Sequence, residues 1–272
     1  MKFYFPLYYL FISRIKTKHE RVSWLIIFPL FLLLTVCLFN GSILCFFIAF
    51  VMTMSLYEIG YFDNDFRTVA KEKNPTIRAD ENRDWLKKRL FSIITVRIII
   101  TIVLFIFLFN RSDSHQQILL SVLIAILIAG FYFHNTLRSR CNVVTYFIIV
   151  TARYLIPAVA ATDSIYYQSM IPFMIFVFPL LRTVEHACKD KYSFPAIKKI
   201  VRNPDVFRVK WYIALTFILV IVYFLSANSI ILNFVALSTY FLIYRAATLY
   251  VSKSTRILRT KHQSYNWDKD EK

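Results

Sequence analysis

The sequence predicts an all-α protein, a polytopic transmembrane bundle of about eight helices with a ninth left open. Three observations lead to this fold class. The 272-residue chain is 58% hydrophobic, which is more apolar surface than a soluble domain of that length can bury. The apolar residues form long continuous runs, and the basic residues gather in alternate connections between the runs. We therefore expect a single integral membrane domain over residues 1–272.

Each expected helix corresponds to one apolar run. A helix needs about 20 mostly apolar residues to cross the hydrocarbon core of a bilayer. The runs are continuously apolar and do not alternate with polar residues as barrel strands do, which favours helices. The expected helices cover residues 23–40, 42–60, 91–109, 117–134, 143–161, 165–181, 211–227 and 229–249.

The basic residues predict the orientation of the chain. If the N-terminus is cytoplasmic, 30 of the 33 Lys and Arg residues fall in cytoplasmic segments, as the positive-inside rule requires. Both termini are then cytoplasmic, and the long polar connections 61–90 and 182–210 cap a site on that side. The net charge of +17 then reflects loops that face anionic lipid rather than nucleic acid. We expect a multi-pass protein of a bacterial inner (plasma) membrane.

Several familiar catalytic motifs are absent from the sequence. The chain has only three glycines and contains neither a P-loop nor a GxGxxG turn. HExxH and GxSxG are also missing. The four cysteines form no CxxC pair, so the sequence indicates no zinc knuckle. Any phosphate chemistry must therefore use side chains and a metal ion.

The first long polar connection carries a candidate metal site. On a helix, Asp65, Thr68 and Glu72 would share one face. Mg²⁺ prefers oxygen ligands and takes one or two carboxylates together with substrate phosphates. The spacing predicts a Mg²⁺ site with Asn64, Asp65 and Glu72 as ligands.

Basic residues follow these carboxylates. Lys73 and Arg78 lie close enough in sequence to grip a diphosphate leaving group beside the metal. The alternative interpretation is a solvated amphipathic loop with local ion pairs.

The second long connection repeats this combination of charges. It begins with "RTVEHACKDKY", in which Arg182, Glu185 and Lys189 fit one helical face. A carboxylate and cations again lie where a helix leaves the bilayer, so this segment is the expected second half of the site.

Two arginines lie inside apolar runs, where a charge is costly unless it faces the bundle interior and is paired. Arg153 is the stronger candidate for a buried cation that binds an anion, and the alternative is a structural ion pair with Glu58. For Arg97 we favour a side chain that extends towards the cytoplasmic surface.

These elements together resemble the UbiA superfamily of intramembrane prenyltransferases, over most of the chain. "NDFRTVAKE" is similar to the NDxxDxxxD motif that follows the second helix in that family, with Thr68 and Glu72 at its later acidic positions. "KNPTIR" resembles the basic tail of that motif. "FHNTLRSRCNVVTYFIIVTARYLIPAVAA" and "FVFPLLRTVEHA" resemble elements of the decaprenyl-phosphate phosphoribosyltransferase branch, although Leu181 replaces a Lys.

The resemblance implies an enzyme that moves 5-phosphoribose from phosphoribosyl pyrophosphate to a polyprenyl phosphate with Mg²⁺, and a role in the cell envelope. Its partners would be a membrane lipid and a phosphorylated sugar donor, with no nucleic acid. Asp65, Glu72 and Glu185 would be catalytic, with Glu185 positioning the donor or acting as a base. The residues that would bind substrate are Lys73, Arg78, Arg138, Arg153, Arg182 and Lys189.

Two other functions stay open from the sequence. The first is a prenyltransferase that moves an isoprenoid from its diphosphate to a small acceptor. The second is a transporter or a membrane scaffold without catalysis, in which the polar clusters would contact lipid headgroups. The oligomeric state, the lipid chain length and the pathway are not encoded in any motif of the chain.

Overall fold

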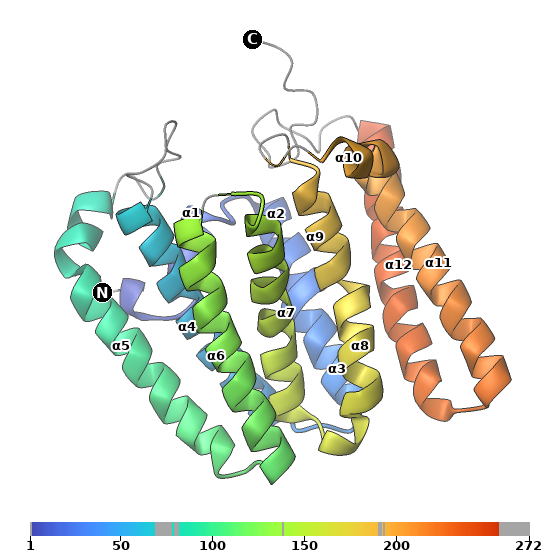
Figure 1. Ribbon diagram of the computed structural model, residues 1–272, viewed down its shortest axis with the longest axis horizontal. Coiled ribbons are helices and arrows are strands. Elements are labelled where there is room, and N and C mark those ends of the chain that lie inside the picture. Colours follow the sequence, from blue (N-terminus) through green and yellow to red (C-terminus); the bar gives the residue numbers. More distant parts are fainter. Residues whose placement is uncertain are drawn as a thin grey trace. The chain divides into compact units, whose positions relative to one another are not determined.

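The computed structural model of the chain (Figure 1) describes residues 2–68, 78, 82–137, 139–189, 192 and 194–255. These residues form helices and connections without strands, and eight helical runs are long and apolar enough to cross a membrane. The predicted all-α bundle and its eight spans are thus confirmed over the described residues, and the protein has the architecture of a multi-pass integral membrane protein. The predictions of a single domain and of two capping connections stay predictions.

The chain divides into two compact units. The described parts of Met1–Arg138 and Ile148–Ser169 form the first, here called the N-terminal unit. The described parts of Ser139–Phe147 and Met170–Lys272 form the second, here called the C-terminal unit. Each unit is described by itself below.

The N-terminal unit holds most of the first five spans. Its elements are η1 (Lys2–Tyr4), α1 (Tyr8–Ser13), α2 (Lys18–Leu25), η2 (Ile26–Leu30), α3 (Phe31–Leu38), α4 (Ile43–Phe62), η3 (Asp63–Thr68), α5 (Arg83–Phe109), α6 (Ser114–Leu137) and most of α7 (Asn142–Ala161). Helix α4 packs against α3, α5 and α6. The short α1 packs its aromatic residues against the end of α4 and the start of α5, around Tyr9, Phe62 and Leu86.

Two π-helical turns interrupt the regular α-helices of this unit. In η2, Pro29 lacks an N–H to donate to the preceding turn. The carbonyl of Ile27 in the same turn accepts a hydrogen bond from the Tyr154 hydroxyl at 2.6 Å. In η3, the wider turn carries Asp63, Asn64 and Asp65 away from the end of α4. Such turns occur frequently at functional sites, and the second one carries the first predicted motif.

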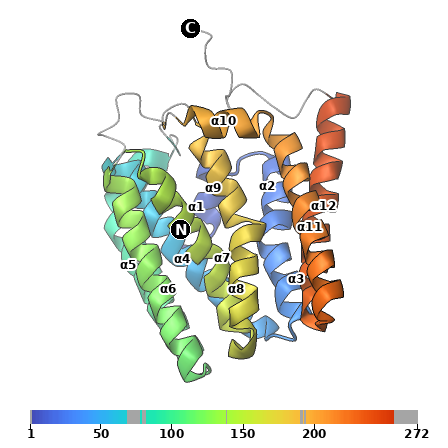
Figure 2. The ribbon, with the colours of Figure 1, turned by 45° about the vertical axis from the view of Figure 1, so that its right-hand side comes forward.

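The C-terminal unit holds the last three spans. Its elements are the start of α7, most of α8 (Tyr167–Val177, after η6, Ser164–Tyr166), α9 (Pro179–Ala187), α10 (Pro195–Val201), α11 (Pro204–Ser226) and α12 (Ser229–Thr255). Helices α11 and α12 form an antiparallel hairpin, and α10 runs across the ends of α9 and α11 (Figure 2).

The span Ser164–Ala187 is broken between α8 and α9. Phe178 has a non-helical backbone, and α9 begins after it at Pro179, so the last carbonyls of α8 lie at a break in the helical hydrogen bonding. Side chains of α11 donate to two of these carbonyls. The Tyr212 hydroxyl donates to the carbonyl of Val177 at 2.8 Å, and the Trp211 indole donates to the carbonyl of Phe176 at 3.2 Å.

Candidate functional site

Asp65 is the centre of a polar cluster in the N-terminal unit. Its side chain is almost completely buried, and both carboxylate oxygens accept hydrogen bonds. The Tyr9 hydroxyl donates to one oxygen at 2.7 Å. Arg14 Nη2 donates to the other at 2.7 Å, as does Asn64 Nδ2 at 2.9 Å. The carboxylate is therefore held by Tyr9 of α1, by Arg14 immediately after that helix and by Asn64 of η3.

Two further guanidinium groups approach Asp65. Arg78 Nη1 lies 3.9 Å from the carboxylate, and Arg83 Nη2 donates to the backbone carbonyl of Asp65 at 3.3 Å. Three arginines thus contact Asp65, two at its carboxylate and one at its backbone carbonyl. Arg14 Nε, Arg78 Nη1 and Arg83 Nη1 are buried without a hydrogen-bond partner among the described residues. This surplus of buried cationic donors can bind an anion, and phosphate oxygens match the planar fork of arginine.

A second buried ion pair positions the N-terminal segment, residues 2–17. Glu58 of α4 and Arg97 of α5 are both fully buried and lie 2.7 Å apart. The Glu58 carboxylate accepts the N–H groups of Leu7 and Leu10 at the start of α1, at 3.1 and 2.8 Å. Arg97 donates to the carbonyls of Phe3 and Phe5.

The predicted extension of Arg97 towards the cytoplasmic surface is therefore wrong. Its guanidinium is fully buried because it pairs with Glu58 and with backbone carbonyls of the N-terminal segment. The alternative pairing of Glu58 with Arg153 is also wrong, since Glu58 pairs with Arg97 instead.

The contacts of the N-terminal segment affect the backbone conformation of Leu7 and the pKa of Tyr9. Leu7 has a φ of 75° at the residue before α1, a conformation that is costly for a side chain with a Cβ. The bonds from Leu7 and Leu10 to Glu58 hold it there. Burial, together with the neighbouring Asp65 carboxylate, raises the pKa of Tyr9, so its hydroxyl stays protonated and donates.

The described residues around Asp65 do not by themselves fit a Mg²⁺ ion. The Asn64 amide and the Asp65 carboxylate, both predicted ligands, lie together, but Asp65 already accepts from Arg14, Tyr9 and Asn64. A setting rich in guanidinium groups suits an anion better than a bare divalent cation. Glu72, Lys73 and Arg138 lie outside the described residues, so the Mg²⁺ site and those three roles stay predictions.

Arg153 lies among aromatic rings inside the N-terminal unit. Its guanidinium carbon is 4.7 Å from the ring centroid of Phe28, 5.0 Å from that of Tyr57 and 5.6 Å from that of Tyr154. Aromatic faces stabilise a cation in an apolar setting. The predicted anion-binding role of Arg153 stays a prediction.

The second predicted motif forms an ion-pair cluster in the C-terminal unit. Glu185 is buried, and its carboxylate accepts from Arg182 of the same helix and from Arg208 of α11. Arg208 Nη2 donates to it at 3.0 Å. Arg182 and Glu185 thus lie together as predicted, whereas Lys189 lies beyond the end of α9.

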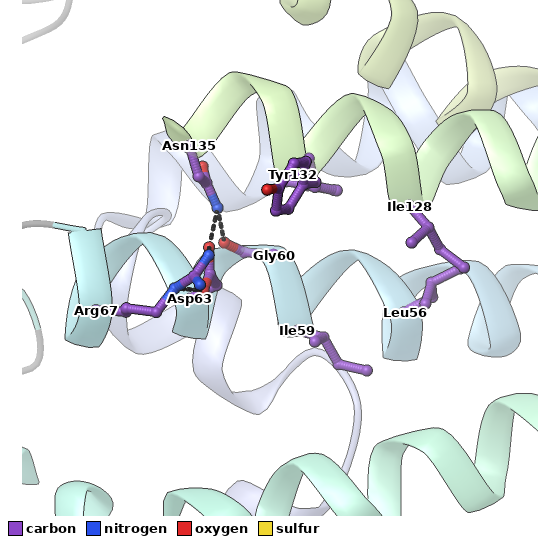
Figure 3. A pocket seen from close by; sticks show the side chains of 9 residues that line it. Leu56, Ile59, Gly60, Asp63, Arg67, Ile128, Tyr132 and Asn135 are labelled. Carbon is purple, nitrogen blue, oxygen red and sulfur yellow. Dashed lines mark hydrogen bonds and ion pairs between the residues drawn. The ribbon is translucent and has the colours of Figure 1, made fainter. Parts of the chain in front are cut away.

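A separate cavity of about 210 Å³ lies between α4 and α6 on another side of η3 (Figure 3). Its apolar wall includes Leu56 and Ile128. Asn135 Nδ2 closes one end by donating to the carbonyl of Gly60 at 3.1 Å and to Asp63 at 2.8 Å. Asp63 also pairs with Arg67. Arg67 thus pairs with Asp63 and not with Asp65, although all three residues lie on η3. It can therefore serve as a control for the arginines around Asp65.

Sequence reasoning missed the partners that other segments supply. Tyr9 and Arg14 lie in an aromatic and basic segment before the first span, which has no clear periodicity. Arg83 and Arg208 lie in segments expected to be polar connections, where basic residues were assigned to the orientation of the chain. Only the density of Arg near membrane boundaries could have indicated them.

Comparison of the chain with protein-family models, with curated proteins and with solved structures finds no match.

Proposed function

We propose that this chain is an intramembrane transferase that binds a phosphorylated substrate against the arginines around Asp65. The observation that carries the proposal is that, among the described residues, three arginines gather at Asp65, two at its carboxylate and one at its backbone carbonyl. Buried nitrogen atoms of Arg14, Arg78 and Arg83 have no hydrogen-bond partner there. A phosphate or diphosphate group supplies the acceptor oxygens and the negative charge that this arrangement needs.

The proposed reaction transfers 5-phosphoribose from phosphoribosyl pyrophosphate to a polyprenyl phosphate, as the resemblance to the UbiA superfamily implies. An oxygen of the lipid phosphate forms a bond to the anomeric carbon. The bond from that carbon to pyrophosphate breaks, and pyrophosphate leaves with the electron pair. Arg14, Arg78 and Arg83 would stabilise the charge on the leaving group. Asp65 is then a positioning residue, because it orients Arg14 and Arg78.

Further roles in the proposal come from the resemblance. Arg153 would hold the acceptor phosphate, and Arg182 with Lys189 would contact the donor. Glu185 is enclosed by two arginines, which supports a positioning role rather than that of a base. Mg²⁺ would neutralise diphosphate charge when bound, and its ligand set depends on Glu72. A bacterial inner membrane with cytoplasmic termini is part of this proposal, supported by the distribution of Lys and Arg.

The test is a transfer assay with the purified full-length protein in detergent. Polyprenyl phosphate and Mg²⁺ are supplied with labelled phosphoribosyl pyrophosphate or, in competition, with a labelled prenyl diphosphate. We expect labelled lipid from the first donor. Arg14→Gln should lower kcat/KM by about 100-fold or more. Arg67→Gln, on the same side of the membrane but facing the cavity, should change it by less than about twofold.

Three outcomes of this assay would contradict the proposal, each in a different way. Product from the prenyl diphosphate alone would favour the prenyltransferase. Equal losses in Arg14→Gln and Arg67→Gln would mean that the Asp65 cluster has no special role. No product from wild type with either donor would contradict the transferase altogether.

A second candidate is a non-catalytic membrane scaffold or transporter. It is favoured by one observation: two of the three carboxylates predicted to be catalytic, Asp65 and Glu185, are buried and ion-paired with arginines. Such pairs can serve structure alone. Replacing Asp65 with Asn would then alter thermal stability but leave the cellular phenotype intact, whereas the transferase predicts that the phenotype is lost.

A further inference from the structure

The polar end of α5 carries exposed basic side chains directly before its apolar part. Lys87, Lys88 and Arg89 are exposed, and Phe91, where the apolar run begins, is 85% exposed. Aromatic side chains collect at the boundary between the hydrocarbon core and water, so this position sets Phe91 at the edge of the bilayer. The three cations lie within one helical turn before it, at the level of lipid headgroups.

Helix η1 packs against this end of α5 and adds a hydroxyl group to it. The Tyr4 hydroxyl lies 3.2 Å from Ser92 Oγ, and Arg89 is close to the same hydroxyl. The Arg89 guanidinium carbon lies 5.2 Å from the ring centroid of Trp85. Lys88 lies on the same helical face as Trp85 and Ser92, three residues after the one and four before the other. We call the surface of these five residues the η1–α5 surface.

The η1–α5 surface and its neighbours carry more positive than negative charge. Lys2 of η1 adds another exposed cation, and Asp84 adds one exposed carboxylate a turn before Lys88. Among the described residues, no carboxylate lies within ion-pair distance of Lys88 or Arg89. A guanidinium that stacks on an indole ring keeps its N–H groups at the edge, where they can donate to an oxyanion. An anion at headgroup level would supply the missing negative charge.

Exposed aromatic rings beside these cations favour a lipid over a soluble anion. Phe5, directly after η1, is 69% exposed, and Phe91 follows Arg89 by two residues. A soluble phosphate compound would leave both rings uncovered, whereas the acyl chains of a phospholipid would cover them. Cations next to aromatic rings at the edge of the bilayer therefore match the two parts of an anionic phospholipid.

The same surface includes part of the N-terminal segment. Arg97 binds the backbone carbonyls of Phe3 and Phe5, on either side of Tyr4. The segment then continues to the side chains that hold the Asp65 carboxylate. A ligand that contacts both Tyr4 and α5 binds only while the segment is docked, with these bonds made. Such a ligand stabilises the docked form by mass action.

We propose that the η1–α5 surface binds an anionic phospholipid and that the bound lipid stabilises the docked N-terminal segment. Lys88 and Arg89 bind the phosphate group, and Phe5 and Phe91 lie against the acyl chains. The lipid is here an effector and not a substrate, so the inference does not depend on the proposed transfer reaction. Lipid binding and hydrogen exchange test it without any measurement of transfer.

The test uses the full-length protein purified in detergent. Native mass spectrometry measures Kd for phosphatidylglycerol, for phosphatidylcholine with the same acyl chains and for glycerol phosphate, which has no acyl chains. Lys88→Gln combined with Arg89→Gln removes two charges from the surface. Lys199→Gln combined with Lys210→Gln is the matched control, because both lysines are exposed and precede the apolar part of α11 in the sequence.

Phosphatidylglycerol should bind more tightly than the other two probes. The double variant should raise its Kd by about 25-fold, at about fivefold for each charge next to an anionic lipid, and should leave the Kd for phosphatidylcholine unchanged. The control pair should change Kd by less than about twofold. Lys88→Gln alone should raise Kd by about fivefold. It carries the test if the loss of the Trp85 contact unfolds the double variant.

Hydrogen exchange at the amides of Leu7 and Leu10, which donate to Glu58, reports on the docked segment. Phosphatidylglycerol at about 100 times the wild-type Kd should slow this exchange by about 100-fold in the wild type and by only about fivefold in the double variant. Phosphatidylcholine at the same concentration should leave the exchange rate as it is without lipid.

Four results would overturn the proposal. An equal rise in Kd for the control pair would mean that the lipid follows the general positive charge of the protein. Equal Kd values for phosphatidylglycerol and phosphatidylcholine would show that the cations do not select an anion. Equally tight binding of glycerol phosphate would replace the lipid by a soluble anion. Binding of phosphatidylglycerol without any slowing of exchange at Leu7 and Leu10 would refute the effect on the N-terminal segment.

Discussion

At the scale of single residues, Glu58 is the most consequential carboxylate of the N-terminal unit. It neutralises Arg97 and also receives the first N–H groups of α1. Removing one member of a buried pair leaves the other charge without compensation, which costs more than the pair itself contributes. The N-terminal segment therefore depends on one side chain of α4.

Glu58→Gln should lower the free energy of unfolding by about 3–5 kcal/mol, measured by denaturant titration in detergent. Glu20→Gln is the matched control. Glu20 forms an exposed capping box with Thr17. A Gln side chain can make the same capping hydrogen bond as Glu, so Glu20→Gln should change the free energy of unfolding by less than about 0.5 kcal/mol. If Arg97→Met added to Glu58→Gln restores no stability, the ion pair is not the source of the loss.

Gly60 allows α4 and α6 to approach closely. A Cβ at Gly60 would lie 2.2 Å from the ring of Phe131, whereas one at Gly130 would lie 3.1 Å from the side chains of Ile148 and Ile149. Gly60→Ala should therefore destabilise the protein by about 1–3 kcal/mol, and Gly130→Ala by less. Thermal melts of both variants test the order. A larger effect at Gly130 would contradict the described packing.

At the scale of elements, the N-terminal segment is the least expected part of the fold. It supplies Tyr9 and Arg14 to Asp65, and it begins α1 with Leu7 at a positive φ. Strain of this kind persists only where surrounding contacts determine the backbone. Here those contacts are the hydrogen bonds of Leu7 and Leu10 to Glu58.

The strain at Leu7 predicts an unusual preference for glycine. Leu7→Gly and Leu7→Ala both remove the side chain, but only glycine adopts a positive φ without cost. Leu7→Gly should be more stable than Leu7→Ala by about 1–2 kcal/mol, measured by chemical denaturation. Equal stabilities would show that this backbone conformation is not strained in the folded protein.

The sequence predicted the spans well because hydropathy reports directly on burial in a bilayer. It placed the starts of two helices too late. Helix α5 begins at Arg83 and α11 at Pro204, well before the apolar runs expected from residues 91 and 211. Lys and Arg are good helix formers, and Asn203 caps α11 through its side chain, so the helices continue into the polar segments.

The candidate site was predicted less completely. Charged residues at the ends of apolar runs indicated Asp65, Arg182 and Glu185. The partners of Asp65 in α1 are separated from it by more than 50 residues. Such pairings depend on how the helices pack, which local periodicity does not encode. For the same reason, the pairing of Glu58 with Arg97 could not be distinguished from a pairing with Arg153.

At the scale of the whole molecule, the cysteines report on orientation in the membrane. Cys141, before α7, and Cys37, at the end of α3, are exposed, whereas Cys188 is buried. Burial raises the pKa of Cys188 to about 11. At neutral pH its thiol stays protonated and unreactive.

Single-cysteine variants in membrane vesicles, treated with a membrane-impermeant maleimide, test this arrangement. At neutral pH, we expect Cys141 to react from the cytoplasmic side only, and Cys188 to react from neither side until denaturant is added. The pH dependence follows from the raised pKa, since labelling of Cys188 should increase only as the pH approaches that value. Labelling of Cys141 from the opposite side would reverse the proposed orientation.

The break between α8 and α9 has a consequence for how the chain enters the membrane during synthesis. The carbonyls of Phe176 and Val177 receive their hydrogen bonds from Trp211 and Tyr212, which the ribosome adds more than 30 residues later. Until α11 is synthesised, these carbonyls lack the two side-chain donors, and an unsatisfied backbone group in hydrocarbon is costly. The sixth span is therefore completed by the seventh, and a nascent chain that ends before α11 should be a preferred target for membrane quality control.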